Sequence, residues 1–137
     1  MKSKRTIHNI FPSWVPYFYG FLCATLIPWT IILAYLLPPK YISHNWDIAW
    51  TGFDVFMIIL FASTAYLAIL KSSYTAISSA MLGTVLLTDA WFDILTSKPG
   101  LSQTRSIMEA LIIELPLVII SFWLSHKIFT SFTKKIT

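Results

Sequence analysis

The residues best suited to chemistry in this chain are its six carboxylates, which all fall between positions 47 and 114. They are Asp47, Asp54, Asp89, Asp93, Glu109 and Glu114. Asp47 and Asp54 are seven residues apart and Asp89 and Asp93 are four apart, so on helices each pair would share one face. Clustered carboxylates bind Mg²⁺, Ca²⁺ or Mn²⁺, and paired carboxylates serve acid–base catalysis.

Four apolar stretches must position these groups, at about residues 14–37, 46–70, 74–96 and 106–128. Each has at least the roughly 20 residues that a transmembrane helix needs. Hydrophobic residues make up 56% of the chain and charged residues 12%, with a mean hydropathy of +0.70, which excludes an ordinary soluble domain. Because the connections are short, we expect an all-α integral membrane protein, a single transmembrane domain over residues 1–137 that forms a four-helix up-down bundle.

The basic residues predict how the spans are oriented, because positively charged flanks stay in the cytoplasm. One side would hold both termini and Lys2, Lys4, Arg5, Lys71, Lys127, Lys134 and Lys135, and the other side Lys40, Lys98 and Arg105. We therefore expect both termini in the cytoplasm, in a multi-pass protein of a bacterial-type inner membrane. The first stretch is too long for a signal peptide, so we expect it to persist as a helix. Basic residues in tails and loops do not predict nucleic-acid binding, and the bilayer is the expected partner.

Three carboxylates would lie deep in the membrane. Counted at about 1.5 Å per residue from the outer helix ends, Asp54, Asp89 and Glu114 lie about 10 to 12 Å below the outer surface. An ionised carboxylate at that depth costs around 3 kcal/mol, so we expect the three to face inward and meet at one level. No Lys or Arg lies at that depth, which leaves a bound cation, shared protons, or water and hydroxyl partners such as Thr51, Thr88 and Tyr17.

Asp47, Asp93 and Glu109 form a shallower tier, within about 5 Å of the same surface. Ser106 and Glu109 have the spacing of a capping box, and Asp47 falls in a first turn, where the helix dipole favours negative charge. Glu109 and Glu114 are five apart, so on an α-helix they would point in different directions.

Prolines mark several helix boundaries. Pro38-Pro39 is expected to end the first helix, and Pro99-Gly100 to separate the third from the fourth. Pro16, Pro28 and Pro116 are expected inside helices, where each removes one backbone donor.

Two stretches resemble a group of small four-span bacterial membrane proteins. They are HNWDIAWTGFD at positions 44–54 and DAWFD at positions 89–93, followed by Glu114-Leu115-Pro116. The resemblance covers most of the chain and implies the same four-span architecture. It brings no activity with it.

Three functions stay open. The first is binding or transport of a cation at an outward-facing site. A metal ion would use Asp47, Asp54, Asp89, Asp93, Glu114 and His44, whereas an organic amine would use Asp54, Asp89, Asp93 and Glu114 with the ring faces of Trp50 and Trp91.

The second function is that of a membrane-embedded enzyme acting on a lipid or isoprenoid, with Asp54 and Asp89 as the acid–base pair. The third is an accessory subunit whose carboxylates meet a basic partner. A divalent cation is the possible cofactor, and no oligomeric state is predicted.

Overall fold

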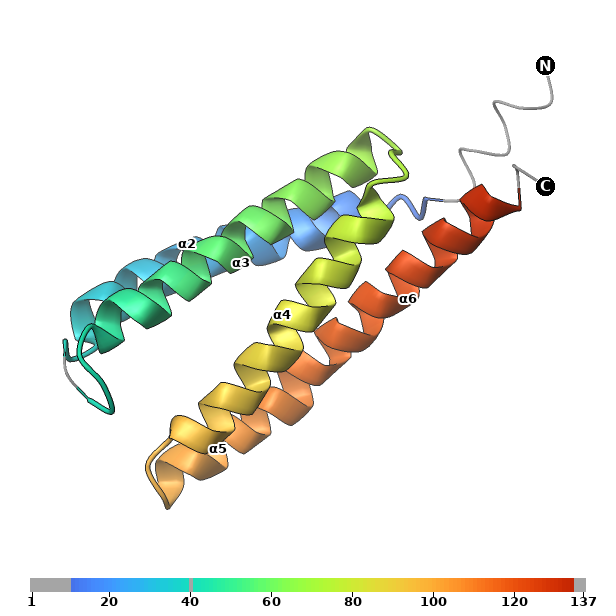
Figure 1. The fold of residues 1–137 in the computed structure, drawn as a ribbon. Helices are drawn as coiled ribbons and strands as arrows, with labels where there is room; N and C mark the ends of the chain where they lie inside the picture. The colour runs from blue at the N-terminus through green and yellow to red at the C-terminus, as the bar shows by residue number, and fades with distance from the viewer. Residues whose placement is uncertain (1–10, 40, 135–137) are drawn as a thin grey trace. The chain divides into compact units, whose positions relative to one another are not determined.

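The computed structural model describes residues 11–39 and 41–134, and its elements there are all helices. Three of them are α2 (Val15–Leu36), α3 (Trp46–Ile69) and α4 (Thr75–Thr96), and a fourth continuous helix covers Leu101–Thr133 (Figure 1). All four are long and apolar enough to cross a membrane, as the sequence predicted. Lys2, Lys4, Arg5, Lys40 and Lys135 lie outside the described residues, and the orientation stays a prediction.

The fourth helix is longer than predicted and is not α-helical throughout. It consists of α5 (Leu101–Glu109), the π-helix η1 (Ala110–Glu114) and α6 (Leu115–Thr133). Its 33 residues extend about 50 Å at 1.5 Å per residue, well beyond a hydrocarbon core of about 30 Å. The first turns of α5 are polar, so we infer that the helix begins outside the hydrocarbon core.

The predicted capping box at Ser106 and Glu109 is wrong. The helix begins five residues earlier, at Leu101, after Gly100, whose φ of 104° is accessible to glycine and strained for other residues. Ser106 is buried inside α5, and its hydroxyl is hydrogen-bonded to the hydroxyl of Ser97. Glu109 is exposed at the end of α5.

The prolines behave differently from one another. Pro16 stands in the first turn of α2, where its missing N–H costs nothing, so its predicted position inside the helix is wrong. Pro28 does lie inside α2. Pro38-Pro39 and Pro99-Gly100 follow the ends of α2 and α4, as expected. Pro116 lies directly after the π-helix, where the loss of its N–H weakens the α-helical ladder.

The chain forms two compact units, Met1–Ser72 and Ser73–Thr137. In the first unit, α2 and α3 pack along each other as an antiparallel hairpin (Figure 1). Tyr19 lies against Phe61, with 6.2 Å between ring centroids, and Cys23 Sγ donates to the Ile58 carbonyl at 3.7 Å.

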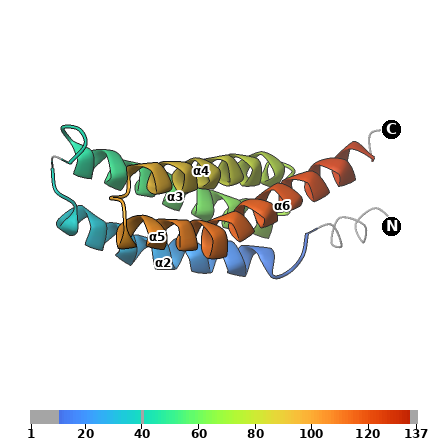
Figure 2. The same ribbon diagram turned by 90° about the horizontal axis from the view of Figure 1, so that it is seen from below.

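In the second unit, α4 contacts α5, η1 and α6. Figure 2 shows α5 continuing into α6. Small residues allow α4 and α6 to approach closely, as in many membrane helix pairs. Gly83 faces the ring of Phe122. Ser125 Oγ donates to the Ala76 carbonyl at 2.7 Å, which links the two helices near the start of α4.

We predict that Gly83→Val destabilises the second unit. A Cβ at this position would lie 3.2 Å from the Phe122 ring, and overpacking of this kind costs about 1 to 3 kcal/mol. The measurement is the thermal unfolding midpoint in detergent. Gly52→Val is the matched control, because a Cβ there meets nothing within 4 Å. Equal midpoints for the two variants would contradict the packing described for α4 and α6.

Candidate functional site

Asp54 is the most buried carboxylate in the first unit. Its side chain is 4% exposed, and Thr30 on α2 is 5% exposed. Thr30 Oγ1 lies 3.3 Å from Asp54 Oδ2 and 2.9 Å from the Leu26 carbonyl oxygen. Asp54 therefore faces the neighbouring helix of its own hairpin, as expected for a deep acidic residue.

Thr30 was not among the hydroxyl partners that the sequence suggested. Of those, Tyr17 is 80% exposed, and Thr88 donates to the Thr84 carbonyl. One signal could have identified Thr30: it is a hydroxyl residue six positions before the end of α2, at a depth close to that of Asp54. The pairing itself depends on how α2 and α3 align, which no residue type encodes.

Asp47 lies in the first turn of α3, as expected, and is half-buried. Its Oδ1 is enclosed and has no hydrogen-bond partner. Asn45 at the N-cap has φ 61° and makes no side-chain cap. His44, just before it, is exposed. This end of α3 thus holds a carboxylate that the helix itself does not satisfy.

A row of aromatic rings runs along the same end of α3. Successive centroids are 5.5 Å apart for Tyr41 and Trp46, 5.6 Å for Trp46 and Trp50, and 6.3 Å for Trp50 and Phe53. Rows of this kind are typical of a membrane–water interface. They also offer ring faces to a cation.

Three carboxylates of the second unit lie close together. Asp93 on α4 is within electrostatic reach of Glu109, and Glu114 is within reach of both. Glu109 is exposed, whereas Asp93 and Glu114 are half-buried. Glu114 Oε2 is enclosed and has no hydrogen-bond partner. We call Asp93, Glu109 and Glu114 the acidic group.

A π-helical turn, η1, lies between Glu109 and Leu115 and includes Glu114. Five residues separate Glu109 and Glu114, so the expectation from an α-helix was that they diverge. In a π-helix the backbone bonds join residues five apart, and here the Leu115 N–H donates to the Ala110 carbonyl. Glu109 is exposed and Glu114 is half-buried, and their predicted divergence stays a prediction.

The remaining predicted residues are placed as follows. Asp89 lies one turn before Asp93 on α4 and is half-buried, and Trp91 is 64% exposed. The predicted meeting of Asp54, Asp89 and Glu114 at one level joins residues of both units, and it stays a prediction. The same is true of Asp54 and Asp89 as a catalytic pair.

The predicted metal ligands do not form a recognisable metal centre in the part of the chain that the structure describes. Over residues 11–39 and 41–134, no three His, Cys, Asp or Glu side chains are grouped so that they could hold a metal ion. The six predicted ligands were Asp47, Asp54, Asp89, Asp93, Glu114 and His44.

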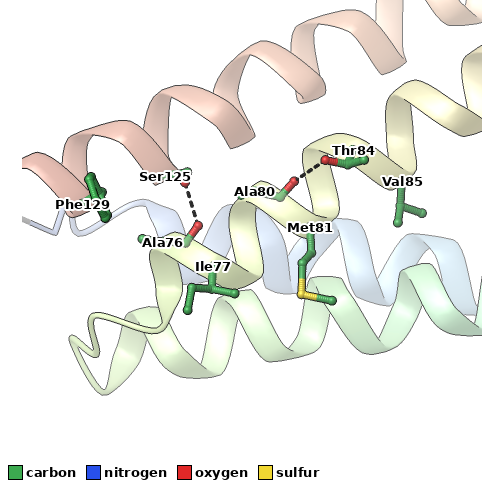
Figure 3. Close-up of a pocket in the computed structure, with 8 residues that line it drawn as sticks. All are labelled: Ala76, Ile77, Ala80, Met81, Thr84, Val85, Ser125 and Phe129. Carbon is green, nitrogen blue, oxygen red and sulfur yellow. Dashed lines mark hydrogen bonds between the residues drawn. The ribbon is translucent and has the colours of Figure 1, made fainter.

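A groove of about 520 Å³ lies on the second unit, away from the carboxylates (Figure 3). It is lined by Ala76, Ile77, Ala80, Met81, Thr84, Val85, Ser125 and Phe129. None of these side chains is charged, and Ser125 already donates to the Ala76 carbonyl. The groove therefore has apolar walls and no chemistry of its own.

No family model, no curated protein and no solved structure matches this chain. The resemblance carried by positions 44–54 and 89–93 stays a prediction. Function must therefore be inferred from the arrangement of the carboxylates.

We predict that Glu109→Lys stabilises the second unit. The substitution replaces a repulsive neighbour of Asp93 and Glu114 by an attractive one at an exposed position, with a gain of about 1 kcal/mol or less. The measurement is the unfolding midpoint at low and high salt, since screening should reduce the gain. Ser102→Lys adds the same charge at an exposed position two turns earlier on α5 and serves as the control. Equal midpoints for the two variants would show that the acidic group does not repel itself.

Proposed function

We propose that this chain is a membrane protein that binds a small cation at the acidic group. The observation that carries the proposal is the Glu114 carboxylate, whose Oε2 is enclosed without a hydrogen-bond partner beside two other carboxylates. Uncompensated negative charge is costly in a membrane span. A bound cation would satisfy Glu114 and remove the repulsion from Asp93 and Glu109 in one step.

An organic ammonium or another singly charged ion fits this group better than a multidentate metal ion. In the described residues, no three ligand side chains are grouped to hold a metal. Trp91 is exposed on α4 two residues before Asp93, and side chains at this spacing face different directions, so Trp91 is not part of the acidic group. Asp54 and Asp89, which the sequence also suggests as ligands, stay candidates for the same cargo.

We place the acidic group on the outer side of a bacterial-type inner membrane, in an up-down bundle with both termini in the cytoplasm. The excess of Lys and Arg on the side of the termini supports this orientation. Lys127 Nζ lies 4.8 Å from the Trp123 ring centroid near the C-terminal end of α6, a pairing suited to a membrane interface. The cation would then enter from outside the cell.

Protons would compete with the cation for the same carboxylates. A site that binds either a proton or a cation can exchange one for the other across the membrane. The proposal therefore extends to proton-coupled transport.

Binding is tested by thermal unfolding of the purified protein in detergent with choline, ethylammonium, Na⁺, K⁺, Mg²⁺ and Mn²⁺. A cation that binds only the folded protein stabilises it by about 2.7 kcal/mol at 100 times its Kd. We expect one of the ammonium ions to raise the midpoint, and Asp93→Asn and Glu114→Gln to abolish the response. Ser102→Lys should retain it. A response to no ion, or a response that survives in both acidic-group variants, would overturn the proposal.

Coupling is tested in proteoliposomes with a pH-sensitive dye inside. Addition of the responding ammonium ion outside should make the interior more alkaline, because protons leave as the cation enters. Glu114→Gln should reduce this flux to the level of protein-free liposomes. Cation uptake without a change of internal pH would restrict the function to uncoupled binding or transport.

A further inference from the structure

We infer that the cation at the acidic group is a primary ammonium ion, R–NH₃⁺, which the π-helical turn binds through its N–H hydrogens. The inference rests on the proposed cation-binding function and names the chemical class of that cation. Two hydrogen-bond acceptors three residues apart carry it, the Leu111 backbone carbonyl and the Glu114 carboxylate.

The first acceptor is a backbone carbonyl that the fourth helix leaves unpaired. In an α-helix the Leu111 carbonyl would accept from the N–H of Leu115, but that N–H donates to the Ala110 carbonyl. In a π-helix it would accept from residue 116, which is a proline and has no N–H. The Leu111 carbonyl oxygen therefore has no backbone donor within its own helix.

The second acceptor is the side chain of Glu114. Its Oε2 is enclosed and has no hydrogen-bond partner. Side chains on a helix lean toward the N-terminal end, so Glu114 reaches back over the turn that contains Leu111. Residues three apart are neighbours on a helix surface. The free carbonyl and the carboxylate are thus neighbours in one turn.

The neutral donors at this end of the unit are engaged with α4. Ser97 Oγ donates to the Asp93 carbonyl at 2.7 Å, so the hydrogen between the Ser97 and Ser106 hydroxyls, 2.5 Å apart, comes from Ser106. Gln103 Nε2 donates to the Ile94 carbonyl at 3.4 Å. These hydrogens satisfy one another and the last carbonyls of α4, and none of them reaches a carboxylate of the acidic group.

The basic side chains near this end do not satisfy Glu114 either. Arg105 is exposed on α5, one turn before Glu109, and Glu114 lies nine residues beyond it, about 13 Å along the helix. Lys98 lies in the connection between α4 and α5. Glu114 Oε2 accepts no hydrogen bond from either residue.

A primary ammonium ion supplies what this turn lacks, three N–H donors and one positive charge. The donors would go to the Leu111 carbonyl, to Glu114 Oε2 and to the Asp93 carboxylate, which is within electrostatic reach of Glu114. A quaternary ammonium ion has the same charge but no N–H, so it would leave the Leu111 carbonyl unpaired. The number of N–H groups, rather than the charge alone, therefore determines the affinity.

The test compares methylammonium, dimethylammonium, trimethylammonium and tetramethylammonium by thermal unfolding of the full chain in detergent, as chloride salts at equal ionic strength. Their N–H hydrogens decrease from three to none at constant charge. We expect the affinity, taken from the midpoint against concentration, to fall about tenfold with each hydrogen bond lost, and tetramethylammonium to give no response.

The outcomes separate this inference from the cation proposal. Equal responses to all four ions, or a response to Na⁺ or K⁺ alone, would overturn the primary ammonium and leave a cation site at the acidic group. No response to any of these ions would overturn both.

Pro116→Ala tests the role of the backbone. The new N–H at position 116 can donate to a carbonyl that the proline leaves unpaired, so the affinity for methylammonium should fall about tenfold. Pro28→Ala is the matched control, because it adds an N–H inside α2, in the other unit, and should leave the affinity unchanged. A Pro116→Ala variant that binds methylammonium as the wild type does would contradict binding at the main-chain carbonyl.

Discussion

The cost of holding a negative charge in hydrocarbon dominates this structure. Four helices supply enough apolar surface to cross a bilayer, and three of them carry carboxylates beyond their first turn. Each carboxylate must face another helix, reach the interface, or give up its charge. The packing within each unit determines how its carboxylates meet this requirement. Small residues bring α4 and α6 together, while the α2–α3 hairpin encloses one acid almost completely.

The two units meet the constraint in different ways. The first buries one carboxylate, Asp54, which accepts a hydrogen bond from Thr30 on a helix without charged residues. The second gathers Asp93, Glu109 and Glu114, and the charge of Glu109 raises the cost of a charge on Asp93 and on Glu114. A crowded group of carboxylates attracts cations more strongly than a single one. The proposal of a cation at the acidic group follows from this difference.

Much of the fold could be predicted because hydrophobic length and proline pairs act locally. Pro38-Pro39 ended the first helix as expected, and the bounds of α2, α3 and α4 agree with the predicted spans to within one residue. The start of the fourth helix could not be predicted, because Gly100 allows a sharp turn directly before Leu101 and the capping signal at Ser106 was misleading. The candidate site was harder to predict than the fold. The contact of Thr30 with Asp54 depends on the alignment of two helices, and the acidic group depends on how α4 packs against α5 and η1, which no residue type encodes.

The π-helical turn also affects everything that follows it. A helix that contains such a turn holds one residue more than an α-helix of the same number of turns, and each α-helical residue rotates the chain by about 100°. The surplus residue therefore sets the angular offset between α5 and α6, both of which contact α4. Ser106 before the turn and Ser121 after it are both buried. Fifteen positions separate these two serines, so the phase of the whole fourth helix relative to α4 is set within five residues, Ala110–Glu114.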